Sequence, residues 1–161
     1  MKHIFLSTLV TLLWFSGCKS ATETGTFAGF QGERDGHPLF AIIDTSLRDS
    51  KVKASFPWFL SISTPFTNPT KDGFTTDQEA STLNDWEDTL EKEFAGECRF
   101  VYVGRVTWKG TRELLHYVDT PDRVVSELNK LADDHPTRVF NIRCERDQQW
   151  EKVSMFLGKS P

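Results

Sequence analysis

The sequence has few of the residues from which metal centres and nucleophilic active sites are built. Its four histidines are scattered, none at a metal-ligand spacing from Cys98 or Cys144, and no CxxC or HExxH motif occurs. No GxSxG motif is present to place a nucleophilic serine on a sharp turn. We therefore expect no metal, no cofactor and no catalytic residue of a recognised kind.

A phosphate-binding loop and a basic surface are missing as well. Gly158-Lys159-Ser160 resemble the end of such a loop, but Val153 stands where the motif requires glycine. The formal net charge is −4 and the lysines and arginines do not cluster. This balance argues against nucleic acid or an anionic membrane surface as partners.

Only one apolar run is long, and it lies at the N-terminus. Residues 1–17 begin with a lysine at position 2, continue as an apolar stretch and end in Ser16-Gly17, which is typical of a secretory signal peptide. Because Cys18 follows directly, the segment resembles a bacterial lipoprotein signal, in which this cysteine is lipidated and becomes the mature N-terminus. The alternative is an ordinary cleaved signal followed by an unremarkable cysteine.

The lipoprotein reading predicts where the protein is found. Residues 18–26 are small and polar, as in a flexible tether, and 27–161 are long enough for a single domain. Lys19 after the cysteine favours the outer membrane in enteric-type sorting. We expect a lipid-anchored protein of the bacterial cell envelope that faces the periplasm.

The best helix signal lies between residues 76 and 96. Thr76 and Glu79 form a capping box, Gly96 is a natural stop, and apolar residues recur at helical spacing between them. The opposite side carries carboxylates, including Asp85, Asp88 and Glu91. We interpret these as a solvated face rather than as a catalytic pair. A second helix is expected to be capped by Asp119 or Thr120, with Pro121 in its first turn, and to be ended by Pro136.

Residues 100–118 give the strongest strand signal, two runs rich in β-branched and aromatic residues around Lys109-Gly110. A two-residue loop would place Thr107 opposite Arg112. A three-residue loop with a bulge would place Thr107 opposite Glu113, and we expect this second register. It assigns four side chains to the core face: Tyr102, Val106, Leu114 and Val118.

From residue 57 onward the expected order is strand, helix, strand, strand, helix, strand. This order predicts an α+β fold, the ferredoxin-like split βαβ arrangement with two helices on one face of an antiparallel sheet. Strands at 26–32 and 38–47 form a hairpin that extends the sheet at an edge not set by the sequence, or folds over it. Cys98 and Cys144 then lie about 14 Å apart, too far for a disulfide.

The expected register also defines a candidate binding surface on the sheet face away from the helices. Its six residues are Arg105, Thr107, Glu113 and Tyr117, with Asp147 and Trp150 from the C-terminal tail. A guanidinium, a carboxylate and a phenol together suit a docked ligand. The alternative is that Arg105 and Glu113 form a solvent-exposed ion pair, whose aliphatic parts Tyr117 covers.

Several phrases resemble the DUF695 family, a bacterial domain of unknown function: NPTKDG (68–73), EASTLNDWEDTL (79–90), VGRVTWKGTRELLHY (103–117) and DQQW (147–150). The residues that carry the resemblance are Asn68, Pro69, Gly73, Glu87, Asp88, Gly104, Arg105, Thr107, Gly110, Arg112, Glu113, Tyr117, Asp147 and Trp150. The resemblance covers residues 30–155. It implies no catalytic residues.

The resemblance implies that in other proteins this domain is coupled to a segment similar to the ribonuclease E inhibitor B family, and hence a binding or regulatory role. A lipid-anchored copy would not meet a cytoplasmic ribonuclease. We therefore expect a binding or interaction module that holds a peptide or small ligand. The alternative is an envelope hydrolase whose site is assembled from Arg105, Glu113 and Tyr117, with Asp147.

Overall fold

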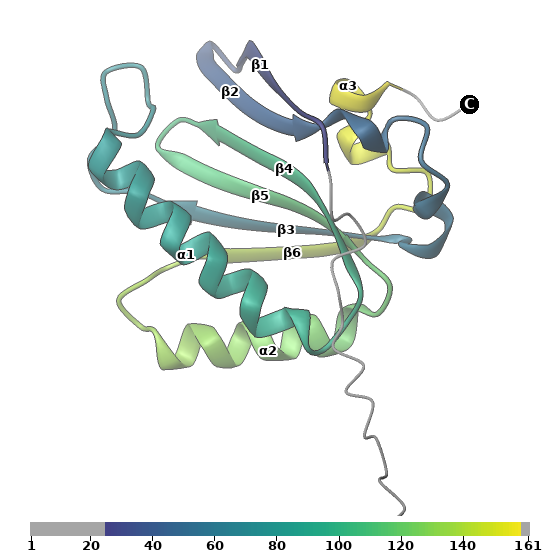
Figure 1. The fold of residues 1–161 in the computed structure, drawn as a ribbon. Helices are drawn as coiled ribbons and strands as arrows, with labels where there is room; N and C mark the ends of the chain where they lie inside the picture. The colour runs from purple at the N-terminus through teal and green to yellow at the C-terminus, as the bar shows by residue number, and fades with distance from the viewer. Residues whose placement is uncertain (1–24, 159–161) are drawn as a thin grey trace, which may run out of the picture.

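The computed structural model describes residues 25–158 (Figure 1). The expected signal peptide and Cys18 lie outside this range. The main elements are β1 (Phe27–Arg34), β2 (His37–Asp44), β3 (Trp58–Pro65), α1 (Asp77–Ala95), β4 (Phe100–Trp108), β5 (Thr111–Val118), α2 (Pro121–Asp134), β6 (Asn141–Arg146) and α3 (Ser154–Leu157). Short 3-10 helices cover Thr45–Leu47, Lys51–Ser55 and Glu151–Val153.

Within residues 25–158 the strands form one open six-stranded sheet in the order β1-β2-β4-β5-β3-β6, accompanied by three α-helices. Every neighbouring pair is antiparallel, which confirms an α+β fold. The N-terminal hairpin extends the sheet by pairing β2 with β4. Strands β4 and β6 are three strand spacings apart, and no disulfide joins Cys98 to Cys144, as expected.

The two long helices begin and end where the sequence predicts. The Thr76 hydroxyl accepts a hydrogen bond from the Glu79 backbone N–H at 3.3 Å, and α1 ends at Gly96. Helix α2 begins with Pro121 after Thr120, whose side chain makes no capping hydrogen bond. Along α1 the buried residues recur at helical spacing: Leu83, Trp86, Glu87, Leu90 and Phe94.

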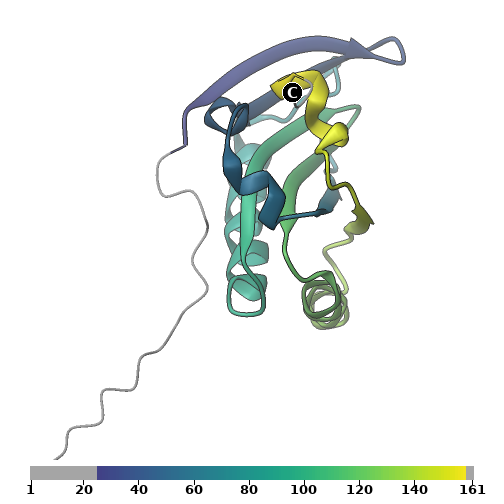
Figure 2. The same cartoon turned by 90° about the vertical axis from the view of Figure 1, so that its right-hand side faces the viewer.

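Side chains from the two faces of the sheet form two separate cores. Helices α1 and α2 cover one face, here called the helix face, where their apolar stripes pack on Leu60, Leu114 and Val118. The opposite face is covered by the C-terminal segment, including Trp150 and Phe156. Figures 1 and 2 show α3 beside the curved β1–β2 hairpin, where the rings of Phe30 and Phe156 lie 5.8 Å apart.

The hairpin register that we expected is wrong at the turn. Lys109 and Gly110 both have positive φ, at 48° and 75°, as a two-residue type I′ turn requires. Thr107 therefore lies opposite Arg112, and Val106 lies opposite Glu113. The β-bulge occurs instead inside β4, between Tyr102 and Gly104.

This bulge decides which side chains reach the helix face. Its extra residue reverses the alternation of β4, so Tyr102 and Arg105 both point toward α1. Val106, expected on the helix face, packs in the opposite core. Gly104 adopts φ 147° at the bulge, where a Cβ atom would lie 2.1 Å from the Ile42 carbonyl oxygen. The close approach of β2 therefore requires glycine at this position.

Candidate functional site

The buried stripe of α1 contains one carboxylate, Glu87, which is only 8% exposed. It lies four residues after Leu83 and three before Leu90, so helical geometry turns it toward the sheet. A buried carboxylate requires partners that offset its lost hydration. Those partners come from β4 and β5.

Five side chains form what we call the Glu87 network: Asn84, Glu87, Tyr102, Arg105 and Arg112. The Tyr102 hydroxyl donates to Glu87 Oε1 at 2.6 Å, and Arg105 Nη1 donates to Glu87 Oε2 at 3.1 Å. Arg105 and Arg112 each donate through Nη1 to the Asn84 amide oxygen, at 3.0 and 2.8 Å. Arg112 Nη1 also lies 3.9 Å from Glu87 Oε2. One carboxylate and one amide oxygen thus hold two guanidinium groups.

The electrostatics of the network follow from its burial. Burial raises the pKa of Tyr102 well above its ordinary value, and the charge and hydrogen bond of Glu87 act in the same direction. Tyr102 therefore remains a proton donor. Burial lowers the pKa of Arg112, and the positive charge of Arg105 adds to this effect while Glu87 opposes it. Arg105 and Arg112 together carry two positive charges, of which the single carboxylate of Glu87 neutralises one.

A pocket of about 390 Å³ opens beside this network. We call it the α1–β4 pocket; its lining residues are Phe27, Ile42, Asn84, Glu87, Asp88, Glu91, Tyr102 and Arg105. The Arg105 side chain is 27% exposed. Among residues 25–158, only its Nη1 has hydrogen-bond partners, so Nε and Nη2 remain available. The pocket thus presents an anchored guanidinium with an unused edge.

Glu91 connects the pocket to a fully buried histidine. Its Oε1 lies 3.1 Å from His116 Nε2, and the imidazole packs against the rings of Phe94, Phe100 and Tyr102. His116 Nδ1 is buried and has no hydrogen-bond partner in the part of the chain described. A carboxylate and an imidazole are two of the three members of a nucleophilic triad, but no serine, threonine or cysteine donates to this ring in that part of the chain.

The six residues of the expected binding surface do not share one face. Arg105 and Thr107 lie on the helix face, because the bulge and the two-residue turn place them there. Glu113 points to the opposite face, half-buried, and accepts a hydrogen bond from the Ser61 hydroxyl at 2.5 Å. Of the six, only Arg105 lines the α1–β4 pocket. That any of the other five binds a ligand stays a prediction.

Tyr117, Asp147 and Trp150 do come together, but in the core of the face opposite α1. The rings of Tyr117 and Trp150 stack at 3.9 Å, and the Tyr117 hydroxyl donates to Asp147 at 2.6 Å. Asp147 also accepts the backbone N–H groups of Glu151 and Lys152 at 2.9 Å. Because all three side chains are at most 7% exposed, this group fastens the C-terminal segment to the sheet.

Sequence reasoning missed Asn84, Glu87, Tyr102 and Arg112 as site residues. The signal for Glu87 was present, since its spacing from Leu83 and Leu90 places a charge on the buried stripe. A buried charge on an amphipathic helix indicates a partner on the surface it faces. The identity of that partner depends on the bulge in β4, which the local pattern did not place.

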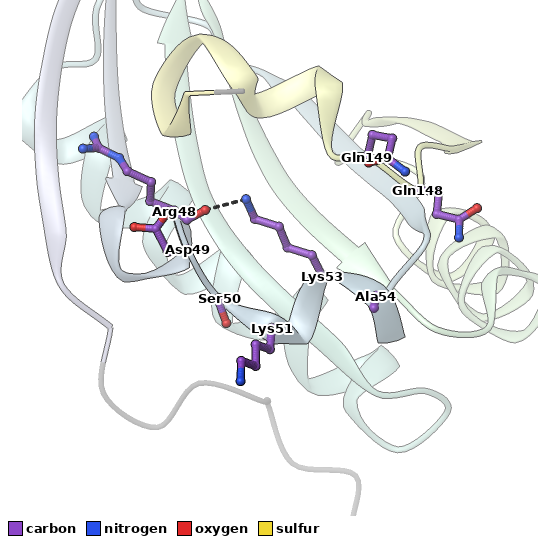
Figure 3. A pocket seen from close by; sticks show the side chains of 8 residues that line it. All are labelled: Arg48, Asp49, Ser50, Lys51, Lys53, Ala54, Gln148 and Gln149. Carbon is purple, nitrogen blue, oxygen red and sulfur yellow. Dashed lines mark hydrogen bonds between the residues drawn. The ribbon is translucent and has the colours of Figure 1, made fainter. Parts of the chain in front are cut away.

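A second pocket, of about 340 Å³, lies where the 3-10 helix Lys51–Ser55 meets the C-terminal segment (Figure 3). It contains the cations Arg48, Lys51 and Lys53, but Figure 3 shows their charged ends pointing in different directions. Lys53 Nζ donates to the Arg48 carbonyl oxygen at 2.6 Å. The cations do not converge on one point, so we favour the α1–β4 pocket as the candidate site.

Residues 25–158 contain neither a membrane-spanning helix nor a cluster of metal ligands. No helix in this range is long and apolar enough to cross a membrane. No three histidine, cysteine or acidic side chains in the same range come together in a way that could hold a metal ion.

Comparison with known proteins gives a family but no described relative. No curated protein and no solved structure matches the chain. The model of a family of unknown function, DUF695, matches residues 29–157, which is most of the chain. The match includes α1, β4 and β5, and therefore nearly all of the α1–β4 pocket. The chain belongs to the DUF695 family.

Proposed function

We propose that this protein is a lipid-anchored binding module of the bacterial cell envelope, in the outer membrane and facing the periplasm, that holds a small ligand in the α1–β4 pocket. The observation that carries the binding role is the anchored guanidinium of Arg105. Glu87 and Asn84 fix its Nη1, Nε and Nη2 make no hydrogen bond within residues 25–158, and the residue lines a pocket of about 390 Å³. Polar groups held in place before the ligand arrives are what a specific site requires.

The arrangement favours binding over catalysis. Both Glu87 oxygens already accept hydrogen bonds, from Tyr102 and Arg105, so this carboxylate is occupied as a structural acceptor. The hydrolase alternative has no observation in its favour, because the residues from which we expected it lie on opposite faces of the sheet. The acidic net charge favours a small molecule or a protein over nucleic acid as the partner.

We also propose that the core from β3 to β6 is the ferredoxin-like split βαβ arrangement. Its strand order β4-β5-β3-β6, with antiparallel neighbours and both long helices on one face, supports this assignment. The β1–β2 hairpin is then an addition at the β4 edge. That addition supplies Phe27 and Ile42, one wall of the pocket.

The lipid anchor has a direct test in the mass of the mature protein. Protein purified from membranes should begin at Cys18 and carry acyl chains on that residue. The Cys18→Ser variant should lack the acyl mass and leave the membrane fraction. A mature chain that begins at a later residue, without lipid, would show that the signal is an ordinary cleaved one.

The pocket can be tested by recovering its ligand. Detergent-solubilised full-length protein is incubated with a small-molecule extract of the cells that produce it, washed, denatured and assayed for retained compounds by mass spectrometry. We expect the wild type to retain a compound that Arg105→Met loses, since methionine removes the donors but keeps an apolar stem.

The matched control is Arg123→Met, which removes an exposed arginine from α2. It should retain the compound as well as the wild type does. Circular dichroism should show that both variants are folded. Equal retention by all three proteins, or retention by none, would refute a small-ligand role for this pocket.

A further inference from the structure

The free edge of Arg105 is suited to a carboxylate. A guanidinium pairs with a carboxylate through two parallel N–H groups, and Nε with Nη2 form such a pair. Both nitrogens lack partners among the described residues, because Asn84 and Glu87 bind only Nη1. The buried Arg112 donates to the same Asn84 oxygen as Arg105 and adds a second positive charge near this end of the pocket.

The other end of the pocket is negative. Asp88 is exposed and has no partner within residues 25–158. Glu91 uses Oε1 toward His116, which leaves Oε2 open. Arg105 is held by both Asn84 and Glu87, and Asp88 and Glu91 lie one and four positions after Glu87 on α1, about 1.5 and 6 Å farther along the helix axis. The carboxylates therefore lie farther along α1 than the end that holds Arg105.

An apolar wall faces these two charged ends. It consists of Phe27, Ile42 and Tyr102, and the rings of Phe27 and Tyr102 lie 6.1 Å apart. Phe27 is 50% exposed, which is unusual for so large an apolar side chain. Such a wall accommodates an aliphatic or aromatic group, and its rings also favour a nearby cation.

We infer that the ligand of the α1–β4 pocket is a small zwitterion, an amino acid or short peptide with a free carboxylate and a free ammonium group. The carboxylate binds Nε and Nη2 of Arg105, the ammonium group binds Asp88 and Glu91, and the apolar part lies against Phe27 and Tyr102. This inference rests on the proposed binding function. A pocket of about 390 Å³ is at the lower end of the range for ligand sites, roughly 300–1,000 Å³, which suits a ligand of this size.

The test compares ligands that differ by one charge. Full-length protein in detergent is titrated calorimetrically with the twenty common amino acids and a set of dipeptides. The best binder is then compared with its N-acetyl form, which lacks the ammonium group, and its C-terminal amide, which lacks the carboxylate. We expect each change to weaken binding about ten- to hundredfold, since each removes a charged hydrogen bond.

Protein variants assign each end of the ligand. Asp88→Asn should weaken binding of the free zwitterion yet leave binding of the N-acetyl form unchanged. The N-acetyl form lacks the ammonium group that the Asp88 carboxylate binds. Arg105→Met should weaken the zwitterion yet leave the amide unchanged. These paired differences would not arise if the substitutions acted only by loosening the fold.

The remaining outcomes overturn the inference, and they separate it from the proposed function. If no amino acid or dipeptide binds while the extract yields another compound lost in Arg105→Met, the pocket binds a ligand of different chemistry. If the acetylated or amidated form binds as well as the zwitterion, the ligand is recognised as an anion or a cation alone. If neither experiment detects binding, the zwitterion inference and the pocket function both fail.

Discussion

Gly104→Ala is expected to lower the free energy of unfolding by about 4 kcal/mol or more, enough to prevent accumulation of folded protein. A Cβ atom at this position would lie 2.1 Å from the Ile42 carbonyl oxygen and 2.9 Å from Ile43 Cα. Neither atom belongs to a flexible side chain, since both are backbone of a strand paired on both sides. The φ of 147° adds strain for any residue with a side chain.

The matched control is Gly32→Ala on the edge strand β1. A Cβ atom there would meet nothing within 4 Å, so the free energy of unfolding should change by less than about 1 kcal/mol. Urea denaturation of both variants, with soluble yield measured alongside, checks the prediction. If the two variants unfold at similar urea concentrations, β2 can withdraw from the bulge, and Gly104 does not fix the position of Arg105.

The features of the fold that depend on local signals could be predicted from the sequence. The cap at Thr76, the stop at Gly96 and the proline at 121 place the two long helices, because each acts within one helical turn. Strand order followed from the sequence of elements, which left few ways to build an antiparallel sheet. The strand order in turn predicted that Cys98 and Cys144 are too far apart for a disulfide.

The bulge in β4 could not be predicted in the same way. A glycine at position 104 is visible in the sequence, but the Ile42 carbonyl that requires it is 62 residues away. Without that contact, Lys109-Gly110 is compatible with either loop length. An error of one residue moves side chains to the opposite face, and this is why the expected surface combined Arg105 with Glu113.

The C-terminal segment shows a second limit of prediction from the sequence. Asp147 and Trp150 were expected beside Tyr117, and they do lie there, but buried. Their burial depends on Trp150 adopting a φ of 57° and on its indole N–H donating to the Phe56 carbonyl oxygen. No local pattern predicts a left-handed tryptophan. Only the packing of residues distant in the sequence shows that this group is structural.

Glu87→Ala is expected to lower the free energy of unfolding by about 3 kcal/mol, because it leaves buried cations without their carboxylate. Arg105 is partly exposed and can turn toward water, but the Arg112 side chain is 6% exposed and cannot. The Tyr102 hydroxyl also loses its acceptor. The neighbouring substitution Asp88→Ala removes an exposed carboxylate and should change stability by less than about 0.5 kcal/mol.

The double variant Glu87→Ala/Arg112→Met separates the loss of a charge partner from the loss of packing. If the unpaired guanidinium of Arg112 is the main penalty, replacing it should recover part of the lost stability, with a coupling of about 1 kcal/mol or more. Urea denaturation of the two single variants and the double variant measures this coupling. Strictly additive effects would mean that Arg112 does not depend on the charge of Glu87, and that the stability lost in Glu87→Ala comes instead from Tyr102, Arg105 and packing.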